Sequence, residues 1–180
     1  MFVPDVLTAA AANGVGVSFH IEPYGGRSPQ TFLEDLRYIH EEYGSHAGVY
    51  RQDGLPVFWL YDVSAEHSAG QVNEWREVLD SVRNTPLDAI FYCLVLRASD
   101  ADFVVKGGFD GGYSYFAAAG FTEASTPDRW AKVQKALASK GKAFIPAVGP
   151  GYNDTLIRPW NAHNVRPRND GASHLAFRTG

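Results

Sequence analysis

The sequence predicts an α/β fold built on a parallel sheet, and three observations support this prediction. Apolar runs of strand length alternate with amphipathic segments of helix length along the chain. Five such runs occur, with helix-like segments between them. One run, residues 89–96, is almost entirely apolar, which is typical of a strand covered on both faces. An open doubly wound sheet and a portion of a (β/α)8 barrel both fit this pattern.

The first elements are a helix, a strand and a longer helix. Residues 5–13 are rich in alanine and predict a helix, and the largely apolar residues 15–21 predict a strand. Ser28 and Pro29 then provide the N-cap and the first-turn proline that commonly open a helix. This helix has apolar side chains at helical spacing, namely Phe32, Leu36, Ile39 and Tyr43.

The middle of the chain predicts two further strands, residues 56–62 and 89–96, with a helix between them. Apolar side chains at helical spacing mark one face of this helix: Val72, Trp75, Leu79 and Val82. Glu74 and Glu77 lie one turn apart beside Trp75. We interpret them as solvated glutamates next to a packing tryptophan, and not as a catalytic pair.

The last third of the chain continues the alternation. A short helix around residues 100–105 leads to a strand near residues 109–116. Thr126-Pro127 opens another helix that Gly141 closes, and residues 142–148 predict the last strand. Because no repeat or linker interrupts this order, the sequence predicts a single domain over residues 1–180.

Composition argues against several classes of protein. The net charge of −4 gives no general attraction to phosphate backbones, so we expect no nucleic-acid partner. The single cysteine, Cys93, rules out an internal disulfide and a cysteine-based metal cluster. The sequence has no stretch of 18 uninterrupted apolar residues, the length that would predict a membrane-spanning helix. We recognise no targeting signal in this chain.

The glycines do not form a nucleotide-binding motif. Gly14-Val15-Gly16 begins a G-x-G pattern, but Phe19 occupies the place of the third glycine, and the motif precedes a strand instead of following one. The glycines of residues 107–112 lack the Lys-Ser/Thr of a phosphate loop. We therefore expect these glycines to serve turns and close backbone approach, and we predict no cofactor and no metal.

Polar side chains follow two of the predicted strands. In an extended strand His20 and Glu22 point to the same face, and Pro23 ends the strand just before Tyr24. Such a carboxylate beside a histidine can bind hydroxyl groups or handle protons, although a buried, internally satisfied Glu22 fits equally well. Asp62 closes the strand 56–62, where it is a second candidate or simply an N-cap for the following loop.

A long irregular segment, residues 149–164, gathers donors and rings without helix or strand periodicity. A loop of this length is costly to order unless it builds a site or a lid. Arginine and asparagine offer donors to sugar hydroxyls, and tryptophan and tyrosine offer stacking faces, whereas a solvated loop is the alternative. The side chains in question are Tyr152, Asp154, Arg158, Trp160, Asn161, His163 and Asn164.

Five segments resemble, in order, the endo-α-1,2-mannosidases of glycoside hydrolase family 99, over residues 17–171. They are SFHIEPYGGR (18–27), YGSHAGVYR (43–51), RNTPLDAIF (83–91), GFDGGYSYFAAAGF (108–121) and IPAVGPGYNDTLIRPWNAHNVRPR (145–168). The resemblance implies a (β/α)8 barrel, of which this chain holds about five strands. It also implies a retaining glycoside hydrolase that acts on α-1,2-linked (glucosyl)mannose of N-glycans in the Golgi lumen, from a type II membrane parent.

The implied chemistry needs no cofactor. The sugar's own 2-hydroxyl, deprotonated by a carboxylate, attacks the anomeric carbon and gives a 1,2-anhydro intermediate. The partner is the α-mannoside oligosaccharide itself. The resemblance places Glu22 in the active site and lines the sugar subsites with five further side chains, namely Tyr24, Tyr152, Arg158, Trp160 and Asn161. His20 and Asp62 complete the set of substrate-binding candidates, and we expect the whole set to gather at one rim.

The family's catalytic carboxylates belong to a Trp-His-Glu-Gly segment on a later strand, which has no counterpart in these 180 residues. We therefore assign no catalytic pair, and keep Glu22 only as an active-site candidate. The expectation is an incomplete barrel that is weakly active or inactive. A non-catalytic carbohydrate-binding fragment is the alternative.

Overall fold

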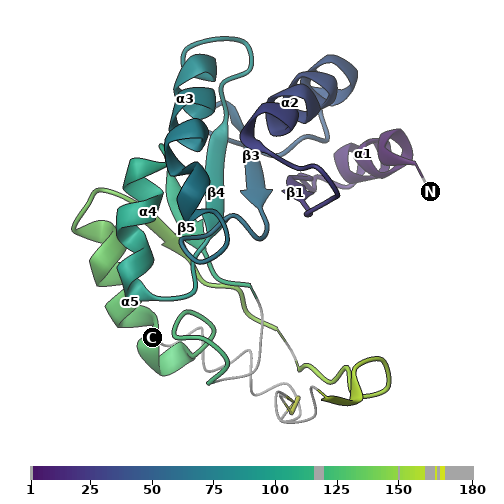
Figure 1. Cartoon of the computed structure of the whole chain (residues 1–180). Coiled ribbons are helices and arrows are strands. Elements are labelled where there is room, and N and C mark those ends of the chain that lie inside the picture. The colour runs from purple at the N-terminus through teal and green to yellow at the C-terminus, as the bar shows by residue number, and fades with distance from the viewer. Residues whose placement is uncertain (1, 116–119, 150, 161–164, 166, 169–180) are drawn as a thin grey trace. The chain divides into compact units, whose positions relative to one another are not determined.

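The computed structural model describes residues 2–115, 120–149, 151–160, 165 and 167–168. Its elements form two compact units, Met1–Leu94 with Asp102–Gly111 and Val95–Ala101 with Gly112–Gly180. Figure 1 shows strands and helices alternating along the chain. All five predicted strands are confirmed, although each is shorter than its apolar run.

The first unit contains three parallel strands in the order β1 (Phe19–Ile21), β3 (Leu55–Leu60) and β4 (Ile90–Leu94). Phe58 on β3 stands opposite Phe19 on β1 and Phe91 on β4. A further strand, β2 (Arg51–Gln52), was not predicted; it pairs antiparallel with the start of β3. Asp53 and Gly54 join β2 to β3, and both have the positive φ that a tight two-residue hairpin turn requires.

The helices of this unit form where the sequence predicts them: α1 (Val3–Ala12), α2 (Pro29–Tyr43), α3 (Val72–Val82, preceded by the 3-10 turn Ala69–Gln71) and α4 (Ala101–Lys106). At the start of α2, the Ser28 hydroxyl accepts a hydrogen bond from the Thr31 N–H at 3.2 Å, as an N-cap does. On α3, Trp75 is buried while Glu74 and Glu77 are exposed, which confirms the interpretation of these two glutamates.

Aromatic rings fill much of the first unit's core. Phe32 on α2 lies 5.5 Å from Trp75 on α3 and 5.9 Å from Phe91 on β4, measured between ring centroids. Phe58 on β3 and Phe109 extend this cluster at 6.0 Å from Phe91 and 5.9 Å from Trp75, respectively. Helices α2 and α3 therefore pack on β3 and β4 through rings, so much of the aromatic content serves packing.

A half-buried guanidinium ties together the loops beside β4. Arg83 donates to Asp88 at 3.2 Å and to Asp110 at 2.9 Å, and also to the carbonyls of Ala89 and Gly108. The same group lies 5.1 Å from the centre of the Phe91 ring. Burial opposes its charge, but the bonds to Asp110 and Asp88 prevail and raise the pKa of Arg83. Hydrogen bonds and ion pairs of Arg83 thus hold the loops beside β4 together.

The second unit contains η2 (Ala98–Asp100), β5 (Gly111–Tyr113, whose first residue belongs to the first unit), η3 (Pro127–Arg129), α5 (Trp130–Ala138) and β6 (Ala143–Ile145). Strands β5 and β6 are neighbours, and just beyond β5 the Ser114 N–H donates to the Ile145 carbonyl at 3.1 Å. Val133 and Leu137 bury the apolar face of α5. None of the helices in the described part of the chain is long and apolar enough to cross a membrane.

Candidate functional site

The carboxyl ends of β1 and β3 lie side by side. The two strands are parallel, with Ile21 opposite Leu60, and the Tyr61 N–H continues the pairing by donating to the Ile21 carbonyl at 3.0 Å. The residues that follow, Glu22 after β1 and Asp62 after β3, therefore emerge at the same edge of the sheet. In parallel α/β folds this is the edge where ligands bind.

A histidine and a carboxylate meet at the end of β1. His20 Nδ1 lies 3.0 Å from Glu22 Oε1, so the two side chains share a face, as the strand period predicts. The Glu22 side chain is 63% exposed, which excludes the buried, internally satisfied glutamate considered above. The His20 ring lies 5.5 Å from the Tyr61 ring. Glu22 is thus oriented by His20 and open to a ligand.

A second carboxylate–histidine pair follows β3. Asp62 has φ of 61°, in the left-handed region that few non-glycine residues adopt, and its carboxylate contacts His67 Nδ1. The backbone N–H of His67 donates to the Ser64 hydroxyl at 3.3 Å, which fixes the loop that presents the ring. Among the described residues no backbone N–H donates to the Asp62 carboxylate, so the N-cap alternative is not borne out.

Two hydrogen bonds hold the turn after Glu22 to neighbouring elements of the first unit. The Tyr24 hydroxyl donates to Asp35 on α2 at 2.7 Å, and Arg27 donates to the Tyr61 carbonyl at 2.6 Å. Partial burial and the bond to Asp35 raise the pKa of the Tyr24 hydroxyl. Tyr24 remains about half exposed, so part of its side chain is accessible two residues beyond Glu22.

The other predicted side chains belong to the second unit and centre on Asp154. The Tyr152 hydroxyl donates to Asp154 Oδ2 at 2.6 Å, and Arg158 donates to the same oxygen at 3.3 Å. The bond to Asp154 raises the pKa of Tyr152. Trp160 is 76% exposed, while Asn161 lies outside the described residues.

The candidate residues thus fall into two groups. His20, Glu22, Tyr24 and Asp62 share the carboxyl edge of the first unit, and Tyr152, Arg158 and Trp160 lie on one segment of the second. That all of them form one rim stays a prediction. Sequence reasoning did not single out His67 as the partner of Asp62, since an irregular loop has no periodicity that would bring them together.

The candidate site residues offer carboxylates and imidazoles that can form hydrogen bonds, together with aromatic rings. No three histidine, cysteine or acidic side chains among the described residues gather closely enough to hold a metal ion. The glycines of residues 107–112 serve backbone packing, because a Cβ on Gly107 would meet the Phe109 ring and one on Gly112 would meet Val95. The expectation of close backbone approach is therefore confirmed at these positions.

Two relatives of known name match nearly the whole chain. The glycoprotein endo-alpha-1,2-mannosidase-like protein of Mus musculus is 39% identical over 179 residues, and the glycoprotein endo-alpha-1,2-mannosidase of Xenopus laevis is 39% identical over 180 residues. Each match covers 94% of this chain and 39% of the relative, so the chain spans about two fifths of the length of these proteins.

Solved structures agree with these matches. The GH99 endo-alpha-mannosidase from Bacteroides thetaiotaomicron, in complex with bis-tris propane, superposes with a TM-score of 0.87 at 42% identity, covering 95% of this chain and 54% of that one. A second structure of that enzyme gives 0.86 at 43% identity, covering 94% and 50%. This supports the predicted partial (β/α)8 barrel. Since the model of glycosyl hydrolase family 99 also matches residues 1–176, the chain belongs to that family.

Proposed function

We propose that this chain forms part of the substrate-binding site of an endo-α-1,2-mannosidase-like glycoside hydrolase. The substrate would be the α-1,2-linked (glucosyl)mannose of N-glycans, cleaved with retention of anomeric configuration. Family membership and the names of the relatives support the reaction class. The observation that most directly supports a sugar site is the double carboxylate–histidine arrangement at the carboxyl ends of two adjacent parallel strands.

This arrangement suits a polyhydroxylated ligand. Glu22 is exposed and Asp62 is partly exposed, so oxygens of both carboxylates can accept hydrogen bonds from sugar hydroxyls. Charge-assisted bonds of this kind are stronger than neutral ones. The histidine beside each carboxylate fixes its orientation, so less side-chain entropy is lost on binding. The rings of Tyr24 and Tyr61 add apolar surface of the sort that a sugar ring can lie against.

We expect the reaction to retain the anomeric configuration by the route that the family resemblance implies. The 2-hydroxyl of the sugar loses a proton to a carboxylate and closes onto the anomeric carbon, while an acid protonates the departing glycosidic oxygen. Water then opens the 1,2-anhydro ring and restores the original configuration. We assign neither role to a residue of this chain, and we expect its own hydrolytic activity to be weak or absent.

Isothermal titration calorimetry of the 180-residue chain with α-1,2-mannobiose and with glucosyl-mannose tests the proposal. We expect binding, and about 10-fold weaker binding for Glu22→Gln, because a charge-assisted hydrogen bond is replaced by a neutral one. Glu77→Gln is the matched control, since Glu77 is exposed on α3. An absence of heat with both sugars would overturn the proposal.

A parallel hydrolysis assay separates the two forms of the proposal. Released mannose or glucosyl-mannose would identify a working hydrolase, whereas binding heat without product would identify a carbohydrate-binding fragment. We also propose the Golgi lumen as the place of action. Co-localisation of the tagged protein with a Golgi marker tests this, and a cytosolic distribution would contradict it.

A further inference from the structure

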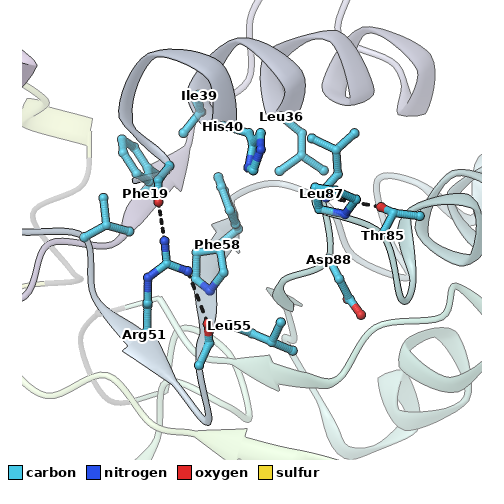
Figure 2. A pocket seen from close by; sticks show the side chains of 15 residues that line it. Phe19, Leu36, Ile39, His40, Arg51, Leu55, Phe58, Thr85, Leu87 and Asp88 are labelled. Carbon is cyan, nitrogen blue, oxygen red and sulfur yellow. Dashed lines mark hydrogen bonds between the residues drawn. The ribbon is translucent and has the colours of Figure 1, made fainter. Parts of the chain in front are cut away.

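The first unit contains a cavity of about 170 Å³ at the end of the sheet opposite to the carboxylate–histidine pairs. Phe19 opens β1, Leu55 and Pro56 open β3, and residues 85–88 immediately precede β4, so the cavity lies at the amino ends of the strands. Helix α2 closes it from above in Figure 2, with Leu36, Ile39 and His40 facing the cavity. The proposed sugar site makes no use of it.

The interior of the cavity is apolar. Phe58, Leu36 and Val49 line it and are at most 6% exposed, and the half-buried Phe19 and Leu87 also belong to the lining. The Phe19 and Phe58 rings stack with centroids 5.6 Å apart. An engineered cavity of about 150 Å³ with a similar aliphatic and aromatic lining is large enough to hold benzene. This cavity therefore has the size and chemistry to accept one six-membered aromatic ring.

The charge at the rim comes from Arg51. Its guanidinium donates to the Gly54 carbonyl at 3.2 Å and to the Gly44 carbonyl, as Figure 2 shows, and no carboxylate lies within ion-pair distance of it in the part of the chain that the structure describes. Two carbonyl oxygens do not neutralise a full positive charge, and a guanidinium has five N–H donors. Arg51 thus presents donors and charge at an exposed position beside an apolar cavity.

The negative group near the cavity does not compete for this charge. Asp88 accepts hydrogen bonds from Arg83 at 3.2 Å and from the backbone N–H groups of Asn84 and Ala89, each at 2.8 Å. Its carboxylate is therefore paired with Arg83, which also pairs with Asp110 and does not line the cavity. Of the charged lining residues Arg51 and Asp88, Arg51 is the one with no ion-pair partner among the described residues.

We propose that this amino-end cavity is a binding site for a small aromatic carboxylate, whose ring enters the apolar interior and whose carboxylate pairs with Arg51. Burial of the apolar ring surface in the cavity supplies affinity. The Arg51 guanidinium supplies selectivity for a negatively charged group. The site is independent of the proposed sugar site, because β1 and β3 each contribute their opposite ends to the two.

Phenylacetate is a suitable probe, followed through amide shifts in two-dimensional ¹H–¹⁵N NMR of the 180-residue chain at pH 7. We expect saturable shifts at Gly44, Arg51, Gly54 and Leu87, with a dissociation constant on the order of 1 mM for a ligand of this size. 2-Phenylethylammonium carries the same ring with the opposite charge and should bind at least about 3-fold more weakly. Acetate, which lacks the ring, should give no saturable shifts.

Two variants test the two halves of the site. Ile39→Trp should fill the cavity and weaken phenylacetate binding more than about 10-fold. Tyr38→Trp is its control, because Tyr38 lies on the same helix but outside the lining, and it should leave binding unchanged. Arg51→Met should weaken binding about 3-fold and abolish the preference for phenylacetate over the ammonium, while Arg37→Met should not. Arg51 is exposed, so its replacement tests the proposal even if Ile39→Trp fails to fold.

Three results would overturn the proposal. The first is an absence of saturable shifts around the cavity at 20-fold excess over the expected dissociation constant. The second is equal affinity for the carboxylate and the ammonium, which would remove the role of Arg51. The third is a set of shifts confined to residues 20–24 and 61–67, which would place the probe at the proposed sugar site instead.

Discussion

At the scale of single residues, Asp62 combines a strained backbone with a chemical contact. Its φ of 61° is costly for a residue with a Cβ, though aspartate tolerates this region better than most. Its carboxylate contacts His67 at the same edge of the sheet where His20 and Glu22 pair. Backbone strain of this kind is often found at functional sites. We therefore expect Asp62 to contribute more to binding than to stability.

Replacement of Asp62 by glycine separates these two contributions. Glycine adopts positive φ without strain, so we expect the free energy of unfolding to change by no more than about 1 kcal/mol. Binding of α-1,2-mannobiose should weaken about 10-fold or more, because the carboxylate is gone. Asn84→Gly, at φ of 59°, is the matched control and should bind normally. Equal sugar affinity in both variants, measured by calorimetry, would remove Asp62 from the site.

Asp88 illustrates how a structural carboxylate makes stability depend on pH. Burial alone would raise its pKa, but the Asn84 N–H and the Arg83 guanidinium outweigh burial and lower the pKa of Asp88. A carboxyl with a lowered pKa in the folded state stabilises the fold fully above its unfolded-state value, about 3.9. That contribution is lost as the pH falls through the folded-state pKa.

Urea denaturation of Asp88→Asn at pH 7 and pH 3 tests this linkage. At pH 7 we expect the variant to lose about 1–3 kcal/mol, since Arg83 loses a charged partner in a half-buried place. At pH 3 the difference should shrink, because this pH lies below the unfolded-state pKa of about 3.9 and the unfolded wild-type chain then binds a proton at Asp88. Asp80→Asn, in an exposed pair with Arg76, should cost less than about 0.5 kcal/mol at either pH. A difference that grows on acidification would contradict the assignment.

At the scale of elements, the sequence predicted helices and strands well where their periodicity is strong. It predicted strand bounds less well where pairing with a distant segment decides which residues form the strand. Of the predicted strand 15–21, only Phe19–Ile21 pairs with β3. Val17 instead bonds to Gly48 and Tyr50, which lie in a connecting segment that no pattern could identify as a partner. The hairpin of β2 was missed although Asp53-Gly54 is a recognised turn signal, because its strand has only two residues.

Helix α2 is the element on which both proposed sites depend. It supplies Asp35, which holds Tyr24 beside the carboxylate–histidine pairs, and it supplies Leu36, Ile39 and His40 to the amino-end cavity. Its start is defined by the Ser28 cap, which the sequence predicted. Weakening this cap should therefore affect both ends of the first unit.

Ser28→Ala removes the oxygen that accepts from the Thr31 N–H. We expect a loss of about 1 kcal/mol in the free energy of unfolding, as for other N-cap deletions. Ser139→Ala, at the C-terminal end of α5, should cost less than about 0.5 kcal/mol, because it is an exposed site away from the start of a helix. Chemical denaturation of the two variants provides the comparison, and equal stabilities would show that the cap contributes nothing.

At the scale of the whole molecule, the order of alternating elements was sufficient to predict a parallel α/β fold. It was not sufficient to choose between an open sheet and a barrel, because both place ligands at the carboxyl ends of strands. The barrel is favoured by the resemblance of five segments, with residues such as Glu22 and Arg158, to the family's sequence in the same order, and the solved structures support it. Contacts such as Asp62–His67 depend on loop geometry that sequence spacing does not encode.

The proposed function depends most on the two carboxylate–histidine pairs at the carboxyl ends of β1 and β3, which we expect to bind the sugar. An NMR titration of the uniformly ¹⁵N-labelled chain with α-1,2-mannobiose tests it most directly, because every assigned amide reports separately. We expect the amides in residues 20–24 and 61–67 to shift together with one dissociation constant, while those around the amino-end cavity stay unchanged. Shifts in only one of these two segments, or different dissociation constants for them, would contradict the proposed site.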